Sequence, residues 1–249
     1  WRYWLLREFK TRYAGSVLGV TWAFVQPLAT LAIFYVLFGL VLAVRVPGLD
    51  VNNGYLLHLL AGLAVWLPFT DALGRGVGSL AAYEDFLRKQ PMPAEILPAV
   101  SVGGSLLVLG IGHVLLWVLS VAQGVGPYVS WLWLPLLVLA QLALTLGLTL
   151  FLSMAHFLWR DVGSAVAFGL QLWFYLTPVV YPLSQVPERF HAWFLLNPVA
   201  CLVLMVQSVV LHMPVPAGVP WALAAWVLVL GGGGWWFFRS MKSALGEAL

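Results

Sequence analysis

Long apolar runs separated by short polar gaps dominate the chain. A run of about 20 apolar residues is the length that an α-helix needs to cross a bilayer. The runs predict six transmembrane helices, at residues 21–44, 56–73, 96–121, 131–156, 162–180 and 221–238. The pattern therefore predicts an all-α integral membrane protein with one transmembrane domain over residues 1–249.

One further apolar stretch, 192–213, does not read as a simple span. Asn197-Pro198 interrupts it, and a residue before proline is pushed out of the helical region. If the stretch crossed fully, the last span would also place Arg239 and Lys242 on the outer side. We therefore expect an outer re-entrant helical hairpin before the last span, with its turn shielded by protein.

The basic residues indicate the direction of the spans. Ten of the twelve lie in the gaps on one side: Arg2, Arg7, Lys10, Arg12, Arg75, Arg88, Lys89, Arg160, Arg239 and Lys242. Only Arg45 and Arg189 lie on the other side. Because short cytoplasmic loops carry an excess of Lys and Arg, both termini are predicted to be cytoplasmic.

Residues 1–15 are too charged to span. In a helix, Leu5 and Phe9 would share one side and Arg7 and Lys10 the other, with Arg12 partly spoiling the pattern. An interfacial helix on an anionic leaflet fits this pattern, and a simple extension of the first span is the alternative.

Composition agrees with a lipid-embedded chain. Hydrophobic residues make up 62% and charged residues 8%, whereas a soluble domain carries about 25% charged residues. The formal charge of +3 is explained by orientation in the bilayer, so no nucleic-acid partner is expected. A single cysteine, Cys201, excludes a disulfide within the chain.

The residues offer no enzyme chemistry. The chain has no G-x-x-x-x-G-K-[ST] loop for nucleotide, and its five histidines are not in a metal-ligand spacing. His113, near the middle of a span, is expected to donate to a helix carbonyl, and the glycines 231–234 are expected to permit close helix packing or a bend. No catalytic, cofactor-binding or metal site is predicted.

No carboxylate lies near the centre of a predicted span, which argues against an ion-coupled carrier. Asp71 comes closest, and an ion pair with Arg75 four residues on explains it. If the protein moves a substrate, the energy is therefore expected to come from a partner.

The longest polar interruption, 76–93, offers a surface for such a partner. Its centre carries four charges that we predict to form the contact with that partner: Glu84, Asp85, Arg88 and Lys89. A solvated loop helix is the alternative.

The chain is rich in aromatic residues, with 14 Trp, 14 Phe and 8 Tyr. Aromatic faces stack on sugar rings, so a pore lined by them could pass a glycan, although core packing explains any single one. The candidates for such a pathway are Trp22, Phe24, Tyr35, Trp66, Phe174 and Tyr175.

Three motifs occur in order along the chain. Residues 6–28 read LREFKTRYAGSVLGVTWAFVQPL, residues 87–98 read LRKQPMPAEILP, and residues 174–187 read FYLTPVVYPLSQVP. The first combines a basic K-x-R-Y element, a G-S-x-L-G-x-x-W pattern and a Pro-Leu pair: Lys10, Arg12, Tyr13, Gly15, Ser16, Leu18, Gly19, Trp22, Pro27 and Leu28. With Asn197-Pro198 in the outer segment, these motifs resemble the permeases of ATP-binding-cassette type-2 polysaccharide exporters.

The resemblance implies a multi-pass homodimer in the bacterial cytoplasmic (inner) membrane, with a separate ATPase subunit that binds ATP and Mg. The interfacial helix and residues 79–93 would contact that ATPase, and the pore would form between the two copies. The ATPase-coupling contact would then be made by Glu84, Asp85, Arg88 and Lys89. The implied substrates are lipid-linked glycans such as O-antigen, capsular polysaccharide or teichoic acid.

Other functions remain open at this point. A type-2 exporter of drugs or lipids would share the topology. An intramembrane glycosyl- or acyl-transferase would need a carboxylate or histidine pair facing a cavity, and a structural scaffold would not explain the charged inner segment.

Overall fold

The computed structural model describes residues 2–12, 15–49, 51, 53–89, 92–243 and 245, and within these ranges the regular structure is helical, without strands. Trp1 and Tyr13, which belong to the predicted interfacial helix, lie outside the described residues, so the Tyr of the K-x-R-Y element is not placed.

Among the residues that the structure describes, five helical segments are long and apolar enough to cross a membrane. They are Gly19–Val41 (η1 Gly19–Thr21, α2 Trp22–Phe34 and η2 Tyr35–Val41), α3 (Gly54–Gly76), α6 (Ile96–Ala122), Val129–Leu158 (η3 Val129–Trp133 and α7 Leu134–Leu158) and Val219–Ser240 (α11 Val219–Trp226, η6 Val227–Gly232 and α12 Gly233–Ser240). Each lies within three residues of a predicted span. Hydrophobic run length alone therefore located these five.

The remaining predicted span, 162–180, is shorter in the structure. Helix α8 covers Asp161–Tyr175, about 22 Å at about 1.5 Å per residue, against a hydrocarbon core of about 30 Å. The helix ends early because Thr177 precedes Pro178, which disfavours helical backbone at that position. The apolar residues after Tyr175 form turns rather than a last helical turn.

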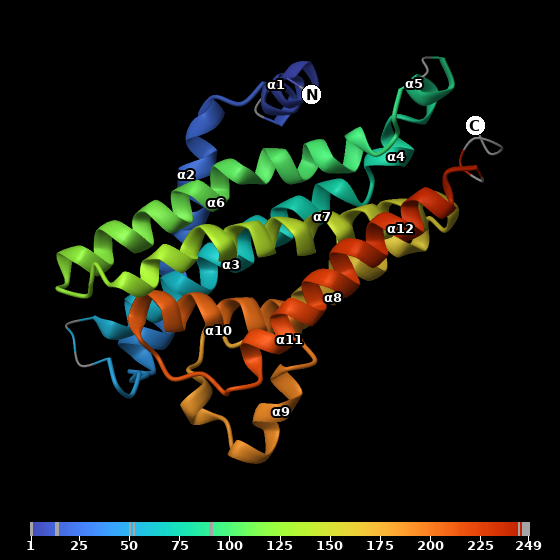
Figure 1. Ribbon diagram of the computed structural model, residues 1–249. Coiled ribbons are helices and arrows are strands. Elements are labelled where there is room, and N and C mark those ends of the chain that lie inside the picture. Colours follow the sequence, from blue (N-terminus) through green and yellow to red (C-terminus); the bar gives the residue numbers. More distant parts are fainter. Residues whose placement is uncertain are drawn as a thin grey trace.

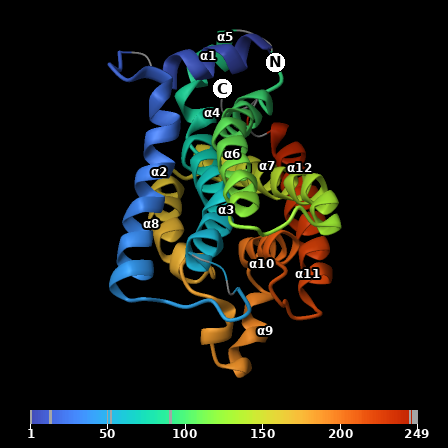
Figure 2. The ribbon, with the colours of Figure 1, turned by 90° about the vertical axis from the view of Figure 1, so that its left-hand side faces the viewer.

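The two chain ends lie at the same end of the bundle (Figure 2). An even number of crossings is needed for that arrangement, so the five long segments require one more. Helix α8, which leads from the end of α7 toward the bent segment, would supply this crossing (Figure 1). The bent pair Glu188–Phe194 and Pro198–Leu211 is the other segment apolar enough to count as one.

The outer segment after α8 is bent sharply. Short helices η4 (Leu183–Gln185), η5 (Glu188–Phe190) and α9 (His191–Phe194) lead to α10 (Pro198–Leu211), and the two arms of the hairpin meet at 109°. The bend falls at Asn197-Pro198. This agrees with the predicted hairpin, and α9 and α10 stand apart in direction in Figure 1.

Helix α3 forms the centre of the bundle and is buried along most of its length, against α6 on one side and α10 on the other. The α7 and α12 backbones meet at Gly147 and Gly234, where an added methyl group on Gly234 would collide with the Gly147 carbonyl. The predicted packing role of the glycine run is therefore confirmed at Gly234.

Three short helices gather at the inner end. Helix α1 (Arg2–Arg12) lies across the ends of the spans, and α4 (Ser79–Ala82) and α5 (Glu84–Lys89) lie beside it (Figure 2). Its orientation is that of an interfacial helix rather than a straight extension of the first span.

Candidate functional site

The predicted coupling residues lie on α5 at the inner end of the molecule. Glu84 accepts a hydrogen bond from Arg88 one turn later, at 2.7 Å, and Asp85, Arg88 and Lys89 are exposed. The acidic pair opens the helix and the basic pair closes it, which complements the helix dipole. The segment presents charges of both signs at this end of the bundle, as a docking surface or a solvated helix would.

Helix α1 packs through aromatic rings against residues 83–89, which we name the coupling segment after its predicted role. The Trp4 ring lies edge-on to Tyr83 and Phe86, with centroids 5.6 and 5.2 Å away. The Arg7 guanidinium lies 5.4 Å from the centre of the Tyr83 ring, within cation–π range. Helix α1 and the coupling segment therefore form one continuous surface, with Lys10 exposed.

Four charged side chains join α1 to the spans in an inner charge cluster formed by Glu8, Arg12, Asp71 and Arg75. Arg12 donates to both carboxylate oxygens of Asp71, at 2.8 and 3.2 Å, and Arg75 donates to the same carboxylate at 2.6 Å. Arg75 also forms an ion pair with Glu8. Two cations and two anions give the cluster a net formal charge of zero.

Helix α6 contributes backbone carbonyls to the same cluster. Arg75 donates to the Ser101 carbonyl at 3.1 Å and Arg12 to that of Gly104 at 3.4 Å. A side chain at Gly104 would press on Arg75, so the glycine leaves the room that the cluster occupies.

Sequence reasoning found only part of this cluster. The i,i+4 pair of Asp71 and Arg75 was predicted and is confirmed. Glu8 and Arg12 were missed as its partners. The four-residue spacing of Trp4, Glu8 and Arg12 does place them on one helix face, but it does not show which residues that face meets.

A second ion pair ties the C-terminal end to the start of α6. Lys242 donates to both carboxylate oxygens of Glu95, at 3.0 and 3.2 Å. Burial alone would raise the pKa of Glu95, but a backbone hydrogen bond and the nearby charges of Lys242 and Arg239 lower it overall. Glu95, which belongs to the motif of residues 87–98, is therefore ionised at neutral pH.

Three of the candidate pathway aromatics are exposed. Trp22 and Phe24 on α2 are each 45% exposed, and Tyr175 at the end of α8 is 64% exposed. They are available to lipid, to a substrate or to another chain.

The other candidates are engaged within the bundle. Trp66 and Phe174 are buried against one another, with ring centroids 5.5 Å apart, as the core-packing alternative expects. Tyr35 donates its hydroxyl hydrogen to the Asn53 side chain at 2.8 Å, which links the first span to the start of α3.

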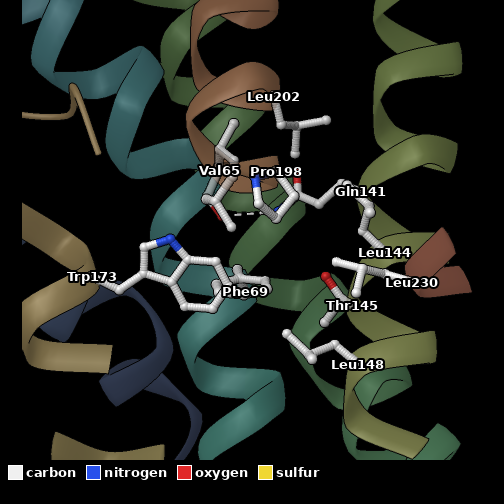
Figure 3. A pocket seen from close by; sticks show the side chains of 11 residues that line it. Val65, Phe69, Gln141, Leu144, Thr145, Leu148, Trp173, Pro198, Leu202 and Leu230 are labelled. Atoms are coloured by element: carbon white, nitrogen blue, oxygen red, sulfur yellow. Dashed lines mark hydrogen bonds between the residues drawn. The ribbon is translucent and has the colours of Figure 1, made fainter. Parts of the chain in front are cut away.

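The centre of the bundle is nearly filled. Figure 3 shows a cavity there among Phe69, Trp173 and Gln141, with a volume of only about 10 Å³. That is about the space for one water molecule. A sugar chain therefore cannot pass through the middle of a single copy at this point.

The described residues bring together no group of three or more metal-ligating side chains, and His113 contacts the Leu109 carbonyl of its own helix at 3.0 Å.

Comparison with known proteins agrees with this architecture. The family described as ABC-2 type transporter matches residues 1–211. The chain is 31% identical over 246 residues to an O-antigen export system permease protein, RfbA, of Myxococcus xanthus, covering 98% of this chain and 92% of that protein.

Two further relatives extend the comparison. A Klebsiella pneumoniae RfbA, also named as an O-antigen export system permease protein, is 29% identical over 201 residues (80% of this chain, 74% of the relative). The polysialic acid transport protein KpsM of Escherichia coli is 23% identical over 242 residues (96% and 92%). The chain therefore belongs to the ABC-2 type transporter family, and it is a multi-pass membrane protein of a transport system.

Proposed function

We propose that this chain is the membrane-spanning subunit of an ATP-driven exporter that moves a lipid-linked polysaccharide, an O-antigen or capsule-type glycan, across the cytoplasmic membrane. The observation that carries the proposal is the similarity along nearly the whole chain to permeases named for O-antigen export and polysialic acid transport. An exporter of drugs or lipids, the alternative, has no such support among these relatives.

The proposal includes a separate ATP-binding-cassette ATPase subunit that carries ATP and Mg. The surface formed by α1 and the coupling segment supports this partner, because it gathers exposed charges at the end where both termini lie (Figure 2). Complementary charges steer and orient such docking more than they strengthen it. In this proposal that end is cytoplasmic.

The proposal also includes a second copy of the chain. The cavity at the bundle centre has room for about one water, so a glycan must travel along the outside of the bundle. A second copy would enclose that path. Trp22, Phe24 and Tyr175 are exposed and can face it, and Trp66 and Phe174 would act only as buried support.

Co-purification tests the proposal directly. The full-length chain is tagged and purified from its native host, and the expected product is a complex of two copies with two ATPase subunits. Its ATPase activity should respond to lipid-linked glycan, and deletion of the chain should remove that glycan from the cell surface. A chain that purifies without an ATPase would overturn the proposal, and a response to drugs or phospholipids alone would favour the alternative.

A further inference from the structure

A second, larger cavity lies between α2, α3 and α6 near the inner end of the bundle. Its volume is about 200 Å³, and its chemistry comes from Arg12, Trp22, Gln26, Thr70 and Asp71. Two of these residues, Arg12 and Trp22, belong to the motif of residues 6–28.

The cavity combines an aromatic face with planar polar groups. Trp22 is 45% exposed, and Gln26 is exposed with no side-chain hydrogen bond in the described part of the chain. The Gln26 amide offers donors and acceptors, and the guanidinium and carboxylate of Arg12 and Asp71 remain partly accessible, at 14% and 20%. A sugar ring needs both features, hydrogen-bonding partners for its hydroxyl groups and an apolar surface for its C–H face.

The charge of the cavity discriminates between a sugar and a phosphate. The Arg12 fork is already paired with Asp71, at 2.8 Å, and the inner charge cluster around it is neutral. A phosphate group would therefore meet a carboxylate beside Arg12, the one cation among the described residues that line the cavity. An uncharged polyhydroxylated ring meets no such repulsion.

The size and depth of the cavity fit one ring. Its volume of about 200 Å³ compares with about 10 Å³ for the cavity at the bundle centre, which has room for about one water. The larger cavity therefore has room for a single pyranose with its hydroxyl groups. Asp71 lies five residues before the end of α3, about 8 Å from it at about 1.5 Å per residue. That is the depth of lipid headgroups, where the first sugars of a lipid-linked glycan lie.

We propose that this cavity binds one neutral sugar ring of the lipid-linked glycan before transport, with Trp22 stacking on the ring and Gln26 and Asp71 binding its hydroxyl groups. The assignment rests on the proposed function, because that function supplies the glycan.

Protection of an introduced cysteine tests the site. Thr70→Cys lies in the cavity wall, and the native Cys201 is fully buried, so the unsubstituted chain serves as the labelling blank. Inside-out membrane vesicles that contain the full chain are labelled with a maleimide in the presence of octyl β-D-glucopyranoside. Dihexanoyl phosphatidylglycerol and 1,2-octanediol are the comparison probes, one with a phosphate and one without a sugar.

The glycoside is expected to slow labelling, and the other two probes are not. Trp22→Leu and Gln26→Leu, each combined with Thr70→Cys, should weaken that protection about five- to tenfold, as the loss of one ring contact or hydrogen bond predicts. Trp117→Leu, an exposed tryptophan on α6 away from the cavity, is the matched control and should leave protection unchanged.

Protection by the phosphate lipid alone, equal protection by all three probes, or no protection would each overturn the sugar site. Failure of the sugar site and failure of the proposed function give different results. Glycan export without glycoside protection would count against this cavity alone, and glycoside protection in a chain that exports no glycan would count against the proposed function alone.

Discussion

Arg12 on α1 donates two hydrogen bonds to the carboxylate of Asp71 on α3, at 2.8 and 3.2 Å. A guanidinium fork matches a carboxylate in both position and plane, so this pair fixes the direction of α1 as well as its place. Arg75 shares the same carboxylate and extends the connection to Glu8 on α1. Helix α1 is thus held to the second span by charge, in addition to any attraction to lipid.

Asp71→Asn should loosen α1 from the bundle. The substitution keeps the size of the side chain but removes the charge that both Arg12 and Arg75 bind, and the expected loss is about 1.5–3 kcal/mol in the free energy of unfolding. Thermal unfolding of the detergent-solubilised chain measures it. Glu84→Gln, which breaks only the exposed pair on α5, is the control and should cost about 0.5 kcal/mol or less. Equal losses in both variants would contradict the structural role of the cluster.

Reversing two charges on α5 should uncouple ATP hydrolysis from export. In the double variant Asp85→Arg with Arg88→Asp, the exposed charges keep their number but exchange their positions, so the fold should survive while docking of the ATPase changes. The measurement is the ratio of glycan exported to ATP hydrolysed in the reconstituted complex. The double reversal of Glu188 and Arg189, which lie in η5 at the outer end, is the control. Unchanged export in the α5 variant would show that Asp85 and Arg88 do not couple ATP hydrolysis to export.

Gly234→Ala and Gly233→Ala should have opposite effects on stability. A methyl group at Gly234 collides with the Gly147 backbone of α7 and forces the two helices apart, whereas one at Gly233 meets nothing within 4 Å. We expect a loss of about 1–3 kcal/mol for Gly234→Ala. For Gly233→Ala we expect a gain of up to about 1 kcal/mol, since alanine favours the helix over glycine. The unfolding midpoints of the two variants, measured side by side, check this.

The sequence predicts best what depends on local spacing. Hydrophobic run length located five spans because the bilayer imposes a length on each, and the Asp71–Arg75 pair followed from one helical turn. The partners Glu8 and Arg12 could not be assigned, since they lie more than fifty residues away in sequence and meet Asp71 and Arg75 only once α1 turns across the spans.

The sequence also does not show which face of each transmembrane helix is buried in the bundle. Trp22 and Trp66 both looked like pathway candidates, yet one is half exposed and the other buried against Phe174. In a span that is apolar on every side, hydrophobic periodicity does not tell the two faces apart. The end of α8 was misplaced for a related reason, because the apolar residues after Tyr175 continue the run although the backbone turns at Thr177-Pro178.

Asn197 should be the residue that sets the hairpin bend. Its Oδ1 accepts from the backbone N–H groups of Val199 and Ala200 and, at 2.9 Å, from the Trp173 indole. Asn197→Ala removes the α10 cap and the link to α8 together, with an expected cost of about 2–4 kcal/mol, the sum of a lost cap and a buried hydrogen bond.

Trp173→Phe separates the two contributions of Asn197. It removes the indole hydrogen bond and part of the ring that packs on Phe69, and it leaves the α10 cap and the Asn197 bond to Thr177 intact, so it should cost less than Asn197→Ala. Proteolysis of the outer segment in right-side-out vesicles reports the loosening of the hairpin. A larger effect from Trp173→Phe than from Asn197→Ala would show that ring packing, rather than the polar link, holds the bend.

The pair of Glu95 and Lys242 should make stability fall in acid. The pKa of Glu95 in the folded chain is lower than its ordinary value of 4.5, so the folded state binds the proton less readily than the unfolded chain does. Its stabilising contribution is therefore fully present above about pH 4.5 and is lost as the pH falls through the folded pKa. Because the pair is partly exposed, we expect it to contribute no more than about 1 kcal/mol to the free energy of unfolding.

The measurement is the difference in unfolding temperature between the native chain and Glu95→Gln, followed from about pH 7 to about pH 3. That difference should be constant near neutrality and shrink in acid, and Lys242→Met should flatten the acid dependence. A difference that grows as the pH falls would mean that Glu95 is held as the neutral acid, and the ion pair would then have no part in fastening the C-terminal helix to α6.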